Sequence, residues 1–345
     1  MPIVIDEGRV PNLLALKHRS RSERSASKQT DCIRIALINN MPDPALEDTE
    51  VQFYELLDAA AGDIPISLKL FSLPELPRND AGQRHLNNFY FDINELLNGR
   101  FDGVIMTGTE PRQPNLRDEP YWPVLIKVLD WAETNTASTV LSCLAAHAGV
   151  LYSDGIPRHR LADKQFGVFE YKKVRDHALT AGGGNTMQIP HSRWNEVRAD
   201  ALDSCGYEVL VQSAQAGIDL FVKKKRDSLF VHFQGHPEYG TRTLLKEYRR
   251  DIKRFLRGER ETYPSMPQGY FDAAATKLLS EFRDKVTENP REELLAEFPE
   301  TAVASALHET WKASAASVYR KWLQYLVSRK AEASSLSSMT PAVRG

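Results

Sequence analysis

The sequence predicts an α/β fold built on a doubly wound, mostly parallel sheet. Apolar runs of strand length alternate with segments whose apolar residues recur at helical spacing. Strands that alternate with helices in this way form parallel sheets with helices on both faces. The strands are expected at residues 32–38, 66–73, 101–108, 138–142 and 228–233, and the helices between them at 47–60, at 122–131 and from 145 onward.

The remainder of the chain adds strands, then helices. Further extended segments are expected at residues 167–171, 187–193, 207–212 and 220–223. An amphipathic helix follows over 244–256, and an apolar stripe over 303–325 predicts a long C-terminal helix that extends the domain.

The chain ends differ in composition from the single domain expected over residues 31–328. Residues 1–30 are basic and rich in serine with few apolar side chains, which predicts a flexible N-terminal arm. Residues 329–345 are rich in serine and alanine, which predicts a disordered tail.

Composition excludes several functions. Basic and acidic residues number 44 and 46, so no global positive field favours nucleic acid. No apolar run approaches the roughly 18–20 residues that span a membrane, and the first residues lack the pattern of a secretory signal. The three cysteines show no metal-ligand spacing. Their number fits a reducing cytoplasm, which keeps a catalytic thiol available.

Chemically useful residues follow the predicted strands. Asn39, Gly108, Cys143 and His236 all lie at or just beyond a strand's carboxyl end. Ligands of parallel α/β sheets bind outside these ends, so the four positions are expected to meet at one edge. A thiol beside an imidazole there suits nucleophilic attack on an acyl group.

Cys143 lies between a predicted buried strand and a predicted helix. The helix N-terminus supplies free N–H groups and a positive dipole end, which favour a thiolate and can bind an oxyanion. The N–H of Leu144 is therefore a candidate oxyanion donor. A small buried core residue is the alternative interpretation of such a cysteine.

His236 and Glu238 are two positions apart, so in an extended segment they point to the same side. Glu238 can then accept a hydrogen bond from one ring nitrogen while the other nitrogen faces the thiol. His147, His191 and His232 are weaker candidates, and His232 is expected to be structural because it falls within a strand.

Several motifs together resemble the homoserine O-acyltransferases of methionine biosynthesis, the homoserine O-succinyltransferase group. They are the Cys143 turn, Gly155-Ile156-Pro157, Pro190-His191-Ser192-Arg193, Gly235-His236-Pro237-Glu238-Tyr239, His85-Leu86-Asn87-Asn88-Phe89-Tyr90 and Tyr121-Trp122-Pro123. The resemblance extends over residues 33–326. It implies a class I glutamine amidotransferase-like fold with a flavodoxin-like sheet.

The resemblance also implies roles by position. Cys143 would carry the acyl group as a thioester, His236 would be the base, and Glu238 would orient it. The implied reaction moves a succinyl group from succinyl-CoA to the hydroxyl of L-homoserine, with no metal or other cofactor. A cytoplasmic homodimer without nucleic-acid or membrane partners is expected.

Three further residues match substrate-binding positions of the family. They are Lys164, Ser192 and Arg250, with Arg250 expected at the carboxylate of the amino acid. Considered without the resemblance, they are a solvated lysine, a turn serine and a surface arginine paired with Glu247.

The loop after the third strand departs from the family pattern. The position that sets acyl-CoA choice usually holds Gly for succinyl and Glu for acetyl donors, and counting back from Tyr121 places Arg112 there. A guanidinium can bind a carboxylate through two parallel hydrogen bonds. We therefore expect Arg112 to contact the succinyl group.

Three alternatives stay open at this stage. One is an acetyl-CoA-dependent homoserine or serine O-acetyltransferase. Another is a glutamine amidotransferase-like hydrolase with the same cysteine, histidine and glutamate, although Cys143 lacks the flanking glycines of Gly-x-Cys-x-Gly. A non-catalytic binding protein is the third.

Overall fold

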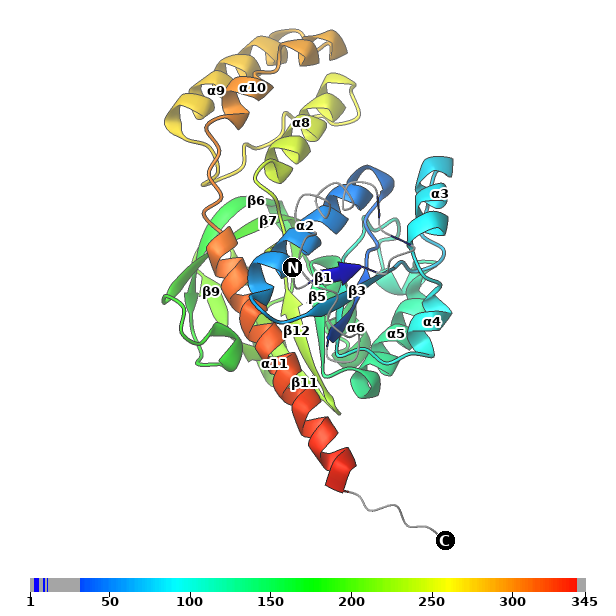
Figure 1. Ribbon diagram of the computed structural model, residues 1–345. Coiled ribbons are helices and arrows are strands. Elements are labelled where there is room, and N and C mark those ends of the chain that lie inside the picture. The colour runs from blue at the N-terminus through cyan, green and yellow to red at the C-terminus, as the bar shows by residue number, and fades with distance from the viewer. Residues whose placement is uncertain (1–2, 6–8, 10, 12–31, 340–345) are drawn as a thin grey trace.

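The computed structural model describes residues 3–5, 9, 11 and 32–339 of the chain. Its main sheet has eight strands in the order β1-β3-β2-β4-β5-β12-β11-β8 (Figure 1). In that order the strands are Ile3–Ile5, Ile66–Phe71, Ile33–Ile38, Gly103–Met106, Ser138–Ser142, Ser228–Phe233, Phe221–Lys225 and Glu208–Val209.

The central strands are parallel, and the order β3-β2-β4-β5-β12 is that of flavodoxin-like sheets. β11 and β8 extend the sheet with antiparallel pairing. The expected α/β class with a mostly parallel, doubly wound sheet is therefore confirmed. All five parallel central strands end at one edge, and the functional candidates follow four of them.

Helices cover both faces of this sheet. Along β2, Ile35 and Leu37 belong to one apolar core and Ala36 and Ile38 to the other, as the two-residue period of a strand requires. The first core contains α2 and α11, and the second contains α4, α5 and α6. These helices span Asp43–Ala61, Lys312–Met339, Ile93–Leu97, Trp122–Asn135 and Leu144–Asp154, and α3 spans Asp80–Phe89.

The extended segments predicted in the second half are strands, but most of them form a separate sheet. Its order is β10-β9-β6-β7, and the strands are Gly217–Ile218, Val211–Ser213, His159–Lys173 and Thr186–Glu196. β6 and β7 form a long antiparallel pair beside the main sheet. Periodicity predicts strands but not the sheet they join, because pairing depends on distant partners.

A third apolar core joins α8 (Thr243–Leu256), α9 (Ala273–Glu288) and α10 (Glu300–Ala304). Figure 1 shows these helices beyond one end of the sheets, and the short α7 spans Ala199–Ser204. The single helix expected over 303–325 is wrong. The chain leaves α10 at Ala304, crosses a turn, and begins α11 at Lys312.

The terminal predictions need correction. α11 continues to Met339, so a disordered tail from residue 329 is wrong up to that point. Lys330 on this helix donates to the Cys32 carbonyl at 2.7 Å and to Asp102 at 2.8 Å. Within the predicted flexible arm, Ile3–Ile5 forms β1 and pairs in parallel with β3. Most of the arm and residues 340–345 lie outside the described residues.

Candidate active site

A cavity of about 550 Å³ opens at the carboxyl edge of the main sheet. Its lining includes Met41 after β2, Gly108 after β4, Cys143 after β5 and His236 after β12. Lys164 from the second sheet lies opposite these residues in the lining. Gly108, Cys143 and His236 therefore meet in one cavity, as expected. Asn39 is not part of the lining, which contains Met41 from the same loop instead.

Cys143 occupies a strained turn between β5 and α6. Its backbone has φ 52° and ψ −113°, a conformation uncommon for residues with a Cβ. The turn is held by its N–H, which donates to the carbonyl of Phe233 on β12 at 2.8 Å. Cys143 is the N-cap of α6, so its half-buried thiol lies at the positive end of the helix dipole.

Leu144, the predicted oxyanion donor, is the first residue of α6 and lines the cavity. N–H groups of a first helical turn have no partner within the helix. A Cβ on Gly108 would lie 2.9 Å from the Leu144 nitrogen, so the loop after β4 needs glycine to approach this N–H. The position suits an oxyanion, and the role of Leu144 stays a prediction.

His236 and Glu238 form the expected pair. His236 Nδ1 lies 2.8 Å from Glu238 Oε1, and both side chains are buried. The imidazole also forms a side-chain hydrogen bond with Cys143. Burial lowers the pKa of His236, but the charges of Cys143 and Glu238 outweigh it and raise the pKa well above its usual value. This balance favours the protonated imidazolium of His236.

The segment around His236 is fixed by close packing. Gly235 lies so near β7 that a Cβ there would come within 2.8 Å of the Pro190 carbonyl. The His236 N–H donates to that same carbonyl at 2.9 Å. On the other side, the Tyr239 ring stacks on the imidazole with centroids 4.2 Å apart. The imidazole of His236 is therefore held in place by its neighbours.

The other candidate histidines are buried, although His147 also lines the cavity. Burial lowers the pKa of His147 and of His232 to about 3, and it lowers that of His191 well below its usual value. His147 contacts Gln234 at 3.0 Å, and His191 contacts the Tyr171 hydroxyl at 2.8 Å. Burial therefore favours the neutral form of all three imidazoles.

The three predicted substrate residues meet on the opposite wall of the cavity. Lys164 Nζ lies 3.0 Å from Asp251 and 3.6 Å from Glu247. Arg250 contacts the same two carboxylates at 3.2 and 3.7 Å, and the Ser192 hydroxyl donates to Glu247. Arg250 pairs with Glu247 and also lines the cavity, and its binding of the amino-acid carboxylate stays a prediction.

Glu247 and Asp251 are the members of this cluster that sequence reasoning missed as functional. Glu247 also accepts the Tyr239 hydroxyl at 2.7 Å, so it links the substrate wall to the residue stacked on His236. The sequence feature that could have identified them is their spacing. Two carboxylates four residues apart lie on one face of α8, with basic residues between them in the sequence.

Arg112 is the candidate that the structure does not bring to Cys143. Its side chain is exposed and lines a neighbouring hollow with Asn40 and Arg78. Its backbone N–H donates to Glu119 at 2.6 Å, which fixes the loop. Counting along the chain located the loop correctly, but side-chain direction in an irregular loop does not follow from position.

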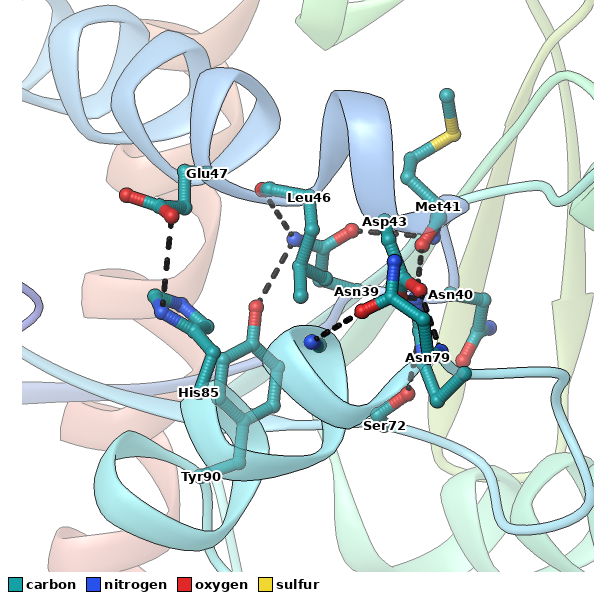
Figure 2. Close-up of polar contacts among 12 residues, drawn as sticks. Asn39, Asn40, Met41, Asp43, Leu46, Glu47, Ser72, Asn79, His85 and Tyr90 are labelled. Carbon is teal, nitrogen blue, oxygen red and sulfur yellow. Dashed lines mark hydrogen bonds and ion pairs between the residues drawn. The ribbon is translucent and has the colours of Figure 1, made fainter.

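The loop between β2 and α2 forms another wall through Met41 and Pro42. Figure 2 shows how Asn39 supports it. Its amide nitrogen donates to the Leu46 carbonyl and to the Tyr90 hydroxyl, each at 3.0 Å, and its oxygen accepts the Met41 N–H at 3.2 Å. Asn39 thus acts behind the cavity, as a support.

Two properties of the described part of the chain bear on other functions. No group of three or more potential metal-ligating side chains gathers there. Over the same residues, no helix combines the length and apolar character needed to cross a membrane.

Comparisons with known proteins point to one family. A family model described as homoserine O-succinyltransferase matches residues 9–333. A homoserine O-succinyltransferase from Rhodopseudomonas palustris is 43% identical over 311 residues, which cover 90% of this chain and 92% of the relative. One from Bradyrhizobium japonicum is 44% identical over 295 residues, covering 85% and 90%.

Among solved structures, a glutamine amidotransferase from Methylobacillus flagellatus is similar with TM-score 0.48 and 14% identity, covering 86% of this chain and 95% of that one. A glutamine amidotransferase from Thermotoga maritima has TM-score 0.44 and 13% identity, covering 86% and 98%.

Proposed function

The chain belongs to the homoserine O-succinyltransferase family, and on this premise we propose that Cys143 carries a succinyl group from succinyl-CoA to the hydroxyl of L-homoserine. The observation that carries the proposal is the arrangement of Cys143, His236 and Glu238 in one cavity at the edge of the sheet. The expected family is confirmed by the comparisons, and the thioester route is proposed from the geometry of the site.

The first half of the reaction loads the enzyme. The Cys143 thiolate attacks the thioester carbonyl of succinyl-CoA, and the developing oxyanion lies by the Leu144 N–H. The bond from carbonyl carbon to CoA sulfur breaks, and the protonated His236 gives its proton to the departing thiolate. One thioester replaces another, so this exchange is nearly balanced in free energy.

The second half transfers the group. Neutral His236 takes the proton of the homoserine hydroxyl as its oxygen attacks the enzyme thioester. The carbon–sulfur bond to Cys143 breaks, and the thiolate returns beside the imidazolium. The product is an oxygen ester, which is lower in free energy than the thioester. No step needs a metal or a further cofactor.

The opposite wall suits the amino acid. Arg250 offers a half-exposed guanidinium for the α-carboxylate, while Glu247 and Asp251 offer carboxylates for the α-ammonium. Lys164 holds both carboxylates, and Ser192 bonds Glu247, so these two residues fix the acceptor site. We extend the proposal to a homodimer in the cytoplasm.

An acetyl donor is the second candidate, because Glu110 lines the cavity and a glutamate in this loop accompanies acetyl donors in the family. Glu110 lies 3.9 Å from Arg254, which offsets its charge. Comparing kcat/KM for succinyl-CoA and acetyl-CoA decides between the donors, and a preference for acetyl-CoA would overturn the succinyl assignment.

Intact-protein mass spectrometry tests the thioester. Brief exposure to succinyl-CoA without homoserine should add one succinyl mass to the wild type and to Cys205→Ala. Cys143→Ala should gain no mass and lose turnover. A wild type that turns over while staying unmodified would contradict the covalent route, and a mass lost in Cys205→Ala would show that the wrong thiol was chosen.

A further inference from the structure

We propose that Arg158 binds the terminal carboxylate of the succinyl group while its thioester carbon lies at Cys143. This proposal rests on the proposed function and names the residue that distinguishes succinyl from shorter acyl groups. It replaces Arg112, which the sequence favoured for the task and which lies outside the cavity.

Arg158 lines the cavity that contains Cys143. It follows the Gly155-Ile156-Pro157 turn after α6 and directly precedes β6. The side chain is half-buried, and one guanidinium nitrogen lies 3.4 Å from the Pro114 carbonyl. That long contact leaves most of its five donors for a ligand.

Several cations of the cavity differ from Arg158 in being paired with carboxylates, whereas Arg160 and Arg260 form no such pair within the described residues and instead contact the Trp194 ring and the Thr262 carbonyl. Lys164 and Arg250 pair with Asp251, and Arg254 approaches Glu110. Within the described residues, no carboxylate forms an ion pair with Arg158 at 4.0 Å or less. A guanidinium that is partly withdrawn from water and lacks a counter-ion is a ready site for an incoming carboxylate.

Negatively charged groups near Arg158 favour its charged form but do not form an ion pair with its guanidinium within the described residues. Glu119 is buried, and its Oε1 already accepts two backbone N–H groups, from Arg112 at 2.6 Å and from Gln113 at 2.8 Å. Glu119, Tyr121 and Cys143 each favour the charged form of Arg158, while burial and Arg160 oppose it, and its pKa is lowered on balance. A bound carboxylate would offset this desolvation.

Arg160 supplies the matched comparison. Residues two apart on an extended segment point to the same side, so both arginines face the cavity. Arg160 is exposed and lies over the Trp194 ring at 4.3 Å, at the solvent side. It suits the phosphates of CoA, which every acyl-CoA shares, whereas the half-buried Arg158 suits the carboxylate that only the succinyl group carries.

Donor discrimination by Arg158→Met and Arg160→Met tests the assignment. We expect kcat/KM for succinyl-CoA to fall roughly 10–100-fold in Arg158→Met, as loss of a charge-assisted pair predicts. The value for acetyl-CoA should change less than about threefold, because acetyl has no second carboxylate. Arg160→Met should weaken both donors by the same factor, and Arg283→Met on the surface of α9 should change neither.

Two results would overturn the proposal. Equal losses for both donors in Arg158→Met would mean that Arg158 binds CoA or only supports the fold. Unchanged kcat/KM values for both donors in the folded variant would mean that Arg158 does not touch the acyl-CoA at all. Arg158→Lys, which keeps the charge but not the paired geometry, should retain part of the preference and guards against a variant that fails to fold.

Failure of this proposal is distinguishable from failure of the proposed function. A wild type that forms the succinyl thioester at Cys143 while Arg158→Met keeps its donor ratio removes only the role of Arg158. A wild type that forms no thioester removes the proposed route itself.

Discussion

Two pairs of histidine and glutamate in this protein have nearly the same nitrogen–oxygen distance but lie in different surroundings. His236 Nδ1 lies 2.8 Å from Glu238, and His85 Nε2 lies 2.7 Å from Glu50. In both histidines burial lowers the pKa, the partner charges outweigh it, and the pKa ends above its usual value. The pair alone therefore does not define a catalytic base.

The difference lies in what surrounds each second ring nitrogen. His236 forms its further hydrogen bond with the Cys143 thiol at the cavity. The Nδ1 of His85 instead faces a second carboxylate, Glu47, at 3.9 Å, as Figure 2 shows. Tyr90 donates to Glu50 at 2.6 Å and closes that cluster. An imidazole–carboxylate pair serves chemistry only where its remaining nitrogen meets a reacting group.

The largest expected effect is the loss of turnover when His236 of the cavity pair is replaced. His236→Asn should lower kcat by roughly 10²–10⁴-fold, because the proton of the homoserine hydroxyl loses its acceptor. Urea unfolding of the same variant should stay close to wild type if the imidazole serves mainly chemistry. Steady-state kinetics measure the first quantity, and near-normal turnover would refute His236 as the base.

Glu238→Gln should have the next largest effect. The amide keeps the shape but lacks the charge that favours imidazolium, so we expect a loss of roughly 10–10²-fold, below that of His236→Asn. The charge of Glu238 raises the pKa of His236, so its removal should lower that pKa. The neutral imidazole that acts as base would then form at lower pH, and the acid limb of the pH–rate profile would move with it. A shift to lower pH is therefore expected, and an unchanged profile would contradict the orienting role.

Tyr90→Phe should affect stability rather than rate. It removes the hydroxyl that donates to Glu50 and accepts from Asn39, which leaves a buried carboxylate with one donor fewer. We expect a loss of about 1–3 kcal/mol in the free energy of unfolding and a kcat/KM within a few-fold of wild type. Urea denaturation and kinetics on one preparation measure both. A large kinetic loss at unchanged stability would move this cluster into the catalytic machinery.

The smallest expected effect is the pH dependence of the His85 pair. Its pKa is raised in the folded state, so its contribution is fully present below the unfolded value of about 6.5 and is lost as pH rises through the folded pKa. His85→Asn should therefore cost more stability at pH 6 than at pH 9, by on the order of 1 kcal/mol. Urea unfolding at both values measures this, and His308→Asn serves as the control. An equal cost at both values would show that the ion pair contributes nothing.

Local pattern was enough to predict that Cys143, His236 and Glu238 lie together. Cys143 and His236 each follow an apolar run, and parallel strands bring their carboxyl ends to one edge whatever their separation in the chain. Glu238 follows because two positions on an extended segment share a side. These predictions needed only the period of a strand and the direction of a parallel sheet.

Tertiary structure decided which residues form the proposed acceptor wall and the proposed donor site. Glu247 and Asp251 on α8 form a polar cluster because Lys164 on β6 contacts both carboxylates and Ser192 on β7 donates to Glu247. Arg158, not Arg112, lines the cavity, because the loop after β4 turns the Arg112 side chain outward while its backbone is fixed to Glu119. Short-range spacing determines strands and their ends, whereas side-chain direction in loops and contacts between sheets depend on partners far away in the sequence.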